Sequence, residues 1–425
     1  MSIAFSIDEI SILFAVLTTV MWILVGIYAL EYTKHDKRRG MFFVFYILVY
    51  FVLLGLDFSA NAITMYMFYE LMTLTSMPLI LHERTKEGIK AGFKYLYYSI
   101  AGALMSLFGI FIFAQYLPTL DFVPGGVLNA TVVEGNETLF MIAVLCMLIG
   151  FGAKAGMFPM HAWLPEAHPV APAPASAVFS GIIAKSGVLA IVRCVFYLIG
   201  VDFLRGSWIQ TAWMTLALLT VLMGSMRAYQ EKVLKKRLAY STVSQISYIL
   251  FGLSTLHPIG FVGAMLHVVF HSIAKNLLFM GAGSIIHQTG ITDVTKLRGI
   301  GRRMPVTIWC FTFAGLSLIG IPPFAGFFSK WYLAEGSLKA GVAGFSWIGP
   351  VVLLISALLT AAYLLPITID GFFPGKQKQE EKQGVCEAGL KMTIPMIILA
   401  LLTLLTGVFY KPLLVFLEKI AASIM

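Results

Sequence analysis

The chain has 425 residues, of which 59% are apolar and only 12% are charged, and its mean hydropathy is +0.87. A water-soluble core of this size could not bury that much apolar surface, so the composition excludes a soluble globular protein and predicts a polytopic membrane protein. The formal charge of +9 would suit a nucleic-acid-binding protein only if the basic residues clustered on one solvated face, and they do not.

Apolar segments long enough to span ~30 Å of hydrocarbon recur along the whole chain. Each must satisfy its own backbone hydrogen bonds inside the membrane, so we expect helices and an all-α fold. The sequence predicts twelve transmembrane helices, near residues 10–30, 41–57, 61–81, 90–115, 138–158, 175–199, 208–228, 235–255, 258–286, 304–335, 349–372 and 392–416.

The basic residues of the predicted loops alternate in step with these helices. The loops after helices 1, 3, 5, 7, 9 and 11 hold 20 Lys and Arg residues, whereas the opposite side holds only Arg205, Lys339 and Lys419. Cytoplasmic loops carry the excess of Lys and Arg. We therefore expect a multi-pass protein of a bacterial or archaeal cell membrane with both termini on the outer side.

Two of the predicted helices are interrupted by small residues and proline. The first interruption is "GFGAKAGMFP", with Gly156 and Pro159, and the second is "GLSLIGIPPFAGFFSKWYL", with Pro322 and Pro323. Proline removes a backbone donor and breaks a helix. An ordinary proline kink is the alternative interpretation, because such kinks are common in membrane helices.

Helices 2–6 and 7–11 are two sets of five, and the fourth helix of each set is the interrupted one. Five is an odd number, so the second set enters the membrane from the opposite side, which indicates an inverted repeat. The predicted organisation is one integral membrane domain, residues 1–425. It comprises a leading helix (1–40), a first inverted repeat (41–200), a second inverted repeat (201–375), and a loop with a final helix (376–425).

Ionisable residues inside the spans are expensive and therefore mark functional positions. Glu70, in "MYMFYELMTL", is the only carboxylate deep in a span, and Lys154 is its expected counter-ion. The pair could exchange a proton. A static buried ion pair that joins two helices is the alternative interpretation.

Lys185 follows on the next helix, and "HVVFHSIAKNLLF" places His267, His271 and Lys275 on one helical face. Two histidines four residues apart can bind zinc. However, a cation occupies the next turn and no carboxylate or cysteine is near, so we expect no metal site. Proton relay suits neutral imidazole better, because it both donates and accepts. Histidines held by neighbouring backbone groups are the alternative.

Ser241, Ser244 and Tyr248 form a polar stripe on the helix near 235–255. They could hold water between charged groups, or they could hydrogen-bond one helix to another. Lys330 follows the second interruption and would be the last proton station. Lys94, Arg193 and Lys411 lie within reach of helix ends and are expected to be snorkelling or structural, and Asp57 and Asp370 to be solvated.

We expect no catalytic residue, metal or cofactor in this chain. The sequence contains no Walker loop, no dinucleotide fingerprint and no CxxC motif. Its isolated cysteines are expected to be buried thiols, and they are Cys146, Cys194, Cys310 and Cys386. Any redox chemistry would belong to partner subunits.

Five segments together resemble the antiporter-like membrane subunits shared by respiratory complex I, energy-converting membrane-bound hydrogenases and Mrp-type cation/proton antiporters. They are "YELMTLTSMPLIL", "GFGAKAGMFPMHAWLPEAH", "RLAYSTVSQISYILFGL", "HVVFHSIAKNLLFMGAGSII" and "GIPPFAGFFSKWYL", and the resemblance covers about residues 5–415. Family members usually have fourteen helices, and this chain starts at what resembles their third. The segment "MHAWLPEAHPVAPAPASAVFSG" resembles the corresponding segment of the hydrogenase and complex I members more than that of the Mrp type.

This resemblance implies roles for the ionisable residues. Glu70 and Lys154 match the family's glutamate–lysine pair, Lys185 the lysine of the next helix, His271 and Lys275 the histidine helix, and Lys330 the lysine of the second broken helix.

The resemblance also implies a function, a proton-translocating subunit of a complex I-related redox complex, either a membrane-bound hydrogenase or an NADH- or ferredoxin-type dehydrogenase. Partner subunits would carry iron-sulfur clusters, and possible further centres are nickel-iron or flavin. The transported ion is H⁺, with Na⁺ as a second possibility. The alternatives are an Mrp-type Na⁺/H⁺ antiporter subunit and a non-pumping membrane scaffold.

Overall fold

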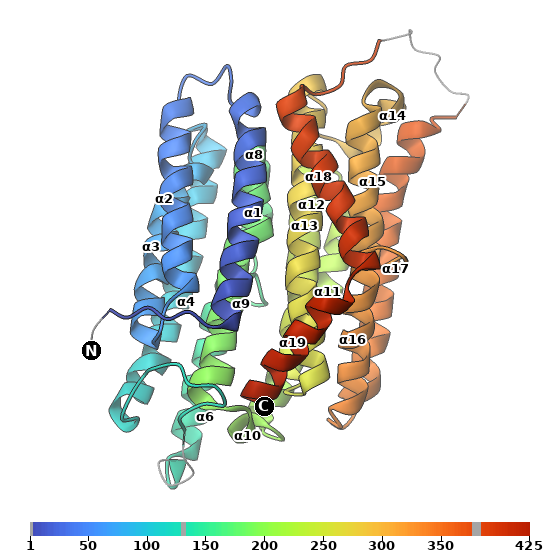
Figure 1. Cartoon of the computed structure of the whole chain (residues 1–425). Coiled ribbons are helices and arrows are strands. Elements are labelled where there is room, and N and C mark those ends of the chain that lie inside the picture. Colours follow the sequence, from blue (N-terminus) through green and yellow to red (C-terminus); the bar gives the residue numbers. More distant parts are fainter. Residues whose placement is uncertain (1–2, 129–132, 376–383) are drawn as a thin grey trace.

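The computed structural model describes residues 3–128, 133–375 and 384–425. These residues are mostly helical, and Figure 1 shows the long helices side by side, with α18 and α19 crossing the front of the molecule. The loop cations Lys376, Lys378 and Lys382 lie outside the described residues. The helices are α1 (Glu9–Tyr32), α2 (Arg39–Asp57), α3 (Ala62–Ile80), α4 (Lys86–Tyr116), α6 (Glu137–Ala155), α7 (Leu164–Val170), α8 (Ala173–Val178), the π-helical η1 (Phe179–Ile183), α9 (Ala184–Val192), the π-helical η2 (Arg193–Ile199), α10 (Val201–Leu204), α11 (Trp208–Gln230), α12 (Leu234–Ser254), α13 (Pro258–Thr289), the 3₁₀ turn η3 (Val294–Lys296), α14 (Ile300–Arg303), α15 (Pro305–Ile319), α16 (Ala325–Lys339), α17 (Phe345–Phe372), α18 (Leu390–Val408) and α19 (Lys411–Ile424).

Within the described part of the chain, nine helical segments are long and apolar enough to cross a membrane. The all-α membrane fold expected from the sequence is therefore confirmed. α12 is not among the nine, although its residues after Tyr240 are buried without exception. Because protein rather than lipid surrounds this helix, its polar side chains can face neighbouring helices.

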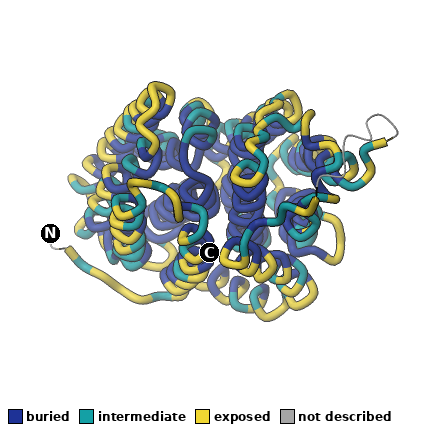
Figure 2. Tube along the Cα trace, turned by 90° about the horizontal axis from the view of Figure 1, so that it is seen from above, coloured by how far each residue is buried: buried dark blue, intermediate teal, exposed yellow. Residues whose placement is uncertain are grey.

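The most buried segments lie in the middle of the bundle. Residues 173–199 are completely buried, and the most apolar stretch of α13 is 94% buried. Seen from above, buried residues occupy the centre and exposed residues the rim (Figure 2). This arrangement brings α9, α12 and α13 together at the core, away from the surrounding lipid.

The first interrupted helix divides where glycine and proline predicted it. α6 ends at Ala155, and Gly156 takes a left-handed conformation with φ 77°. Pro159 lies in the connection that follows, and the helical path resumes with α7. Glycine has no Cβ and adopts this conformation at little cost, so it ends the helix in the interior of the bundle.

The second interrupted helix has the same local design. α15 ends at Ile319, followed by Gly320 with φ 91°, and α16 begins at Ala325. Pro322 and Pro323 lie in the short connection between them. The inverted repeat that would relate the two breaks stays a prediction.

The last predicted helix differs from the structure. The sequence predicts one helix over 392–416, but α18 ends at Val408 and α19 starts at Lys411. Pro412 occupies the first turn of α19, where it has no N–H to continue the ladder of α18. The chain therefore changes direction, and α19 crosses the bundle obliquely (Figure 1).

Candidate functional site

The ionisable residues predicted from the sequence lie on five helices, which are α3, α6, α9, α13 and α16. Lys154 is on α6, Lys185 on α9, and His267, His271 and Lys275 are on α13, each no more than 1% exposed. Burial of this extent is unusual for lysine unless the charged group has partners. The partners of each group are therefore informative about its role.

Lys154 is held by neutral hydroxyl groups. Its Nζ donates to Thr73 Oγ1 at 2.8 Å, to Tyr95 Oη at 2.9 Å and to Ser99 Oγ at 3.0 Å. Nζ also lies 4.5 Å from the centroid of the Tyr95 ring. An ammonium group has three N–H donors, so these three oxygens satisfy it fully. A neutral amine could keep two of the same bonds.

Glu70 lies on α3 and is only partly buried. Its Oε1 atom is buried without a hydrogen-bond partner among the described residues. The ion pairs found in the described part of the chain do not join Glu70 to Lys154, although the two charges interact through space. The hydroxyl groups therefore stand where a counter-ion was expected.

Lys185 turns its amine back toward its own helix. Nζ donates to the backbone oxygen of Ser180, at 2.6 Å, within the π-helical segment η1. The Ser180 hydroxyl in turn lies 2.7 Å from Thr242 Oγ1 on α12. π-Helical turns are frequent at functional sites because they disturb the regular backbone ladder. Here the disturbed turn supplies the acceptor for a buried amine.

Lys275 also has neutral partners. Nζ donates to Ser241 Oγ at 2.7 Å and to the backbone oxygen of Leu238 at 3.0 Å, both on α12. Tyr363 Oη donates to the same serine oxygen at 2.7 Å. This serine belongs to the predicted polar stripe, and it accepts a hydrogen bond directly from Lys275.

The next serine of the stripe does something different. Ser244 Oγ lies 2.8 Å from Ser225 Oγ on α11 and 3.3 Å from Ser356 Oγ on α17. These contacts join three helices, which is the second interpretation. At Ser244 the stripe therefore joins helices, while water held between charged groups stays a prediction.

The two histidines of α13 have unequal surroundings. His267 Nδ1 lies 2.9 Å from Ser329 Oγ, and its Nε2 lies 3.2 Å from Gln245 Oε1. His271 has no hydrogen-bond partner on either ring nitrogen among the described residues. The two rings stack with centroids 5.8 Å apart. His271 is also within electrostatic range of Lys185, Lys275 and Lys330.

Lys330 lies on α16, just after the second break, and is partly buried. Its Nζ donates to the backbone oxygens of Leu318 and Ile319, at 2.6 and 3.0 Å, at the end of α15. The last carbonyls of a helix have no partner within that helix and carry partial negative charge. The amine therefore bonds directly to the carbonyls that the break leaves free.

A stacked pair of rings connects Lys330 with the histidines. Lys330 Nζ lies 5.0 Å from the centroid of the Tyr248 ring, and that ring lies 5.6 Å from His267. Lys185, the two histidines, Lys275 and Lys330 thus form one neighbourhood. The hydrogen-bond partners of Lys154 come instead from α3 and α4.

Sequence reasoning missed two features of this interior. His168 lies on α7, is 1% exposed, and stacks on Phe279 with ring centroids 4.6 Å apart, while its Nε2 has no partner among the described residues. The hydroxyl partners of Lys154 were also missed. A usable signal existed for Thr73, which lies one turn after Glu70 in "YELMTLT".

Two of the three cations assigned to helix ends, Lys94 and Arg193, have defined partners. Lys94 forms an ion pair with Glu166. Arg193 is 2% exposed and pairs with Asp8, so it is structural rather than snorkelling. Asp57 is 2% exposed, and the expectation that it is solvated is wrong, because α1 covers the end of α2 at this point.

No group of three or more His, Cys, Asp or Glu that could hold a metal ion occurs among the described residues. The side chains that the structure brings together around α13 are amines, imidazoles and hydroxyls, and such groups can carry and pass protons.

Residues 59–365 match the family model described as "NADH:quinone oxidoreductase/Mrp antiporter, TM". The chain belongs to this family. Residues 1–43 match a second model, "NADH-Ubiquinone oxidoreductase (complex I), chain 5 N-terminus". The resemblance inferred from the five motifs is thereby confirmed, and all the functional residues predicted from the sequence lie within the first match.

Relatives of this antiporter-like family come from each of its three branches. The chain is 30% identical to NADH-quinone oxidoreductase subunit N of Desulforudis audaxviator, with 88% of this chain and 75% of the relative covered. It is 31% identical to a Na(+)/H(+) antiporter subunit of Bacillus subtilis, with 94% and 79% covered. It is 28% identical to hydrogenase-4 component B of Escherichia coli, with 94% of this chain and 61% of the relative covered.

The fold is also found in solved membrane complexes. A chain of the Mrp complex from Dietzia sp. superimposes with a TM-score of 0.86 at 23% identity, covering 100% of this chain and 85% of that chain. The antiporter-like fold is therefore common to this chain and an Mrp subunit.

Proposed function

We propose that the chain translocates protons as an antiporter-like membrane subunit of a complex I-related redox complex. The parent complex is a membrane-bound hydrogenase or an NADH- or ferredoxin-type dehydrogenase. One observation carries the proposal. Lys154, Lys185, Lys275 and Lys330 take hydroxyls and carbonyls as their hydrogen-bond partners within the described chain.

Neutral partners suit a group that changes charge. A lysine whose only role was to hold two helices together would pair with a carboxylate, because an unpaired buried charge is costly. Hydroxyl and carbonyl oxygens accept a hydrogen bond from either an ammonium or an amine. Lys154, Lys185, Lys275 and Lys330 can therefore gain and lose protons without losing their positions.

Several buried polar atoms near these lysines have no hydrogen-bond partner among the described residues. They include both ring nitrogens of His271, Nε2 of Gln245, Oδ1 of Asn276 and Oε1 of Glu70. Buried groups of this kind normally bind water. We propose that water bridges these atoms and carries protons along Lys185, Lys275, His271, His267 and Lys330.

Glu70 lies on a face of α3 that the rest of the described chain leaves open. Its neighbours on that face, Met67, Leu71 and Leu74, are 45%, 43% and 59% exposed. A carboxylate facing lipid is expensive, so the face calls for cover by a neighbouring membrane subunit that offers a cation or donor. Glu70 would then couple the two subunits while it interacts with Lys154 through space.

We further propose the orientation given by the loop charges, with both termini outside. The redox centres, iron-sulfur clusters with nickel-iron or flavin, would belong to partner subunits, since the sequence carries none of the motifs that bind them. Proton transport by this chain would be coupled to those centres through the other membrane subunits of the complex.

Proton transport by vesicles that contain the intact complex tests the proposal. Lys275→Met should abolish redox-driven proton transport, because methionine keeps the length of the side chain but cannot carry a proton. Lys339→Met is the matched control, since Lys339 is exposed and pairs with Glu335 at 2.8 Å. Normal transport by Lys275→Met would reject the role.

A Na⁺/H⁺ antiporter subunit is the second candidate, favoured by the 31% identity to the antiporter subunit of Bacillus subtilis. The two candidates differ in what drives the protons. A Na⁺ gradient imposed on vesicles without electron donor moves protons only in the antiporter. Proton movement that requires the donor supports the redox complex.

A further inference from the structure

A second ionisable cluster, separate from the lysines and histidines described above, lies where α1 begins and α2 ends. Asp57, the last residue of α2, is 2% exposed. Thr18 Oγ1 on α1 donates to its Oδ2 at 3.2 Å. One hydroxyl is weak compensation for a buried carboxylate, so this environment favours the protonated acid.

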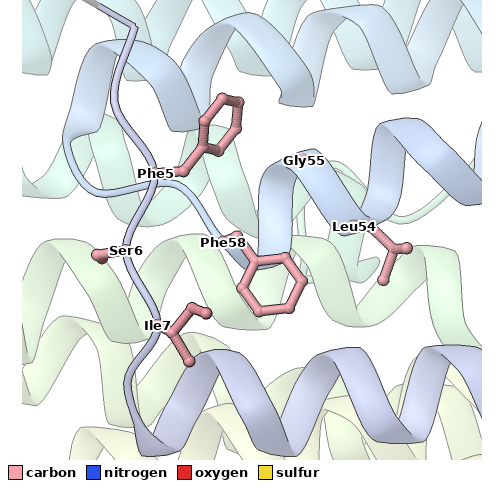
Figure 3. Close-up of a pocket in the computed structure, with 6 residues that line it drawn as sticks. All are labelled: Phe5, Ser6, Ile7, Leu54, Gly55 and Phe58. Atoms are coloured by element: carbon pink, nitrogen blue, oxygen red, sulfur yellow. The ribbon is translucent and has the colours of Figure 1, made fainter.

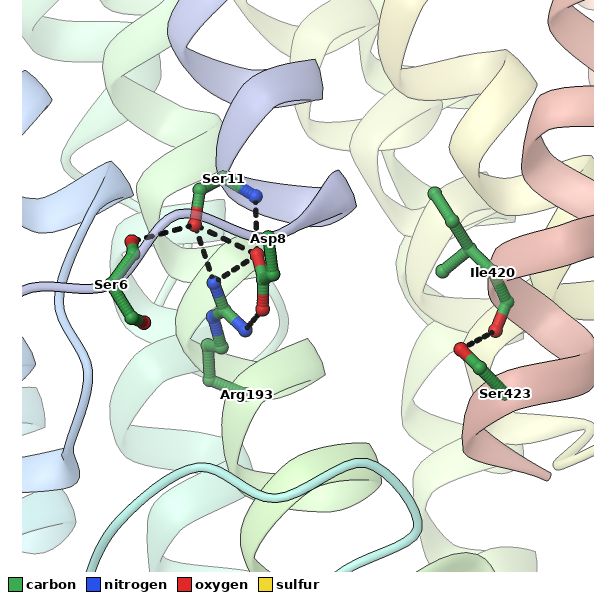
Figure 4. A network of polar contacts seen from close by, with 6 residues as sticks. All are labelled: Ser6, Asp8, Ser11, Arg193, Ile420 and Ser423. Atoms are coloured by element: carbon green, nitrogen blue, oxygen red, sulfur yellow. Dashed lines mark hydrogen bonds and ion pairs between the residues drawn. The ribbon is translucent and has the colours of Figure 1, made fainter.

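Arg193, on η2, provides the positive charge of the cluster. Its Nη1 and Nη2 donate to the two carboxylate oxygens of Asp8, at 2.5 and 2.9 Å, and Nη2 also donates to Ser11 Oγ at 2.9 Å (Figure 4). The guanidinium lies 4.7 Å from the centroid of the Tyr197 ring. Asp8 is the outer member of the pair, with a side chain 28% exposed.

The environment of Asp8 favours its ionised form. Partial burial raises the pKa of this carboxyl, but the hydrogen bonds and charge of Arg193 and the donors of Ser11 outweigh burial and hold the pKa below its ordinary value. The exposed acid is therefore charged in the state described, while the buried acid nearby has little to stabilise a charge.

One guanidinium stands within range of both acids. Ser11 and Thr18 are two turns apart on one face of α1, about 10 Å along the axis, and they mark the levels of Asp8 and Asp57. The charge of Arg193 also acts on Asp57. The cluster thus comprises a buried acid, a buried arginine and a partly exposed acid.

A cavity of about 510 Å³ opens beside the cluster (Figure 3). Ser6 and Ile7, which precede Asp8, line one side, and Leu54, Gly55 and Phe58, which flank Asp57 in the sequence, line the other. The backbone oxygen of Ser6 also accepts from Ser11 Oγ at 3.5 Å. This space is large enough to hold water, and the residues that line its two sides are the chain neighbours of Asp8 and Asp57.

We propose that Asp57 is a proton-exchange site of the outer face, and that Arg193 transfers its pairing between Asp57 and Asp8 as the proton leaves. The O–H bond of Asp57 breaks, the guanidinium pairs with the carboxylate that forms, and the proton passes through water to the Asp8 carboxylate. Asp8 then releases it to the medium. During the transfer the cluster keeps one positive and one negative charge, so no isolated charge is created in the interior.

Other charged groups nearby belong to the same surface. Glu9 of α1 pairs with Lys419 of α19 at 3.8 Å, and Tyr197 is the other titratable side chain against Arg193. Neither Glu9 nor Lys419 has a hydrogen bond with Asp57 or Arg193 among the described residues. The inference rests on the proposed proton translocation, because Asp57 would supply an exit for protons from the interior.

Infrared difference spectra of the intact complex, recorded between acid and alkaline media, test the exchange directly. In the unmodified complex we expect the C=O band of a buried carboxylic acid at acid pH, and this band should disappear at alkaline pH. The band should be missing from Asp57→Asn at every pH. Thr18→Val should shift this band to higher frequency, because the acid loses its hydrogen-bond donor. A band that ignores pH, or that persists in Asp57→Asn, would overturn the inference.

Proton release by vesicles gives the functional arm. Asp57→Asn should slow release about a hundredfold, the effect of removing a positioned proton-transfer group. Asp202→Asn is the matched control, because Asp202 is 91% exposed and pairs with Arg205. If Asp57→Asn transports normally while Lys275→Met does not, the exchange site is wrong and the proposed function stands. If both transport normally, the proposed function itself is wrong.

Discussion

The two broken helices of the chain place a lysine beside the break in opposite ways. Lys154 precedes its break, is fully buried, and bonds to three side-chain hydroxyls from α3 and α4. Lys330 follows its break, is partly buried, and bonds to two backbone carbonyls at the end of the preceding half-helix. The same pair of residue types, glycine and proline, produces both breaks.

The difference shows where each lysine gets its stabilisation. The partners of Lys154 are side chains, so single substitutions on other helices can adjust its balance between ammonium and amine. The partners of Lys330 are carbonyls that exist because the helix ends, so its environment depends on the break itself. Substitutions at the two lysines and their surroundings should therefore have different consequences.

Lys154→Met and Lys330→Met should have the largest effects on transport. Lys154→Met should abolish proton transport, because methionine fills the space but cannot carry a proton. Assembly should be retained, since removing a buried cation relieves its desolvation, and Tyr95 keeps its contact with Ser76 at 2.7 Å. A pH-sensitive dye in vesicles measures transport, with Lys339→Met as control. Transport at the unmodified rate would show that Lys154 only packs.

Lys330→Met should stop transport and also loosen the second break, because the carbonyls of Leu318 and Ile319 lose their donor, at a cost of about 1 kcal/mol in the free energy of unfolding. Lys330→Gln separates the two effects. Its amide can donate to the carbonyls but cannot titrate, so thermal stability should recover while transport stays absent. If Lys330→Gln transports protons, Lys330 is a structural clamp.

Tyr95→Phe removes one of the three hydroxyls that hold Lys154. Loss of this acceptor should disfavour the ammonium form by about 1–2 kcal/mol, and slow transport about five- to thirtyfold. Tyr97→Phe on the same helix is the control, because Tyr97 is 66% exposed. Lys330 offers no comparable test, because its partners are backbone carbonyls. Equal transport by Tyr95→Phe and the control would mean that the hydroxyl does not set the proton balance.

The smallest effects on transport should come from the glycines that end the two half-helices. A Cβ at Gly156 would lie 2.3 Å from Leu164 Cδ1, and one at Gly320 would lie 3.1 Å from Lys330 Cδ. Both positions have positive φ, so alanine costs about 1–2 kcal/mol at each. Thermal unfolding of the purified complex should show similar losses for both variants. Only Gly320→Ala should also slow transport, because it presses on Lys330 itself.

Much of the architecture could be predicted from the sequence, because its causes are local. Apolar runs of about 20 residues specify membrane helices wherever they pack. Gly156 with Pro159, and Gly320 with Pro322 and Pro323, end helices through their own backbone chemistry. The cost of an ionisable group in a membrane is enough by itself to mark Lys154, Lys185 and Lys275 as exceptional.

Tertiary structure alone decided which groups meet. The pairing of Lys154 with Thr73, Tyr95 and Ser99 depends on how α3, α4 and α6 are rotated against one another, and helical period gives the face of a residue but not its partner. The burial of Asp57 has the same origin. Its place at the end of a span suggested solvent, but α1 lies across it and Thr18 donates to it. The sequence by itself determined that this protein is a membrane bundle with charged groups inside, and the packing of distant helices determined what those groups can do.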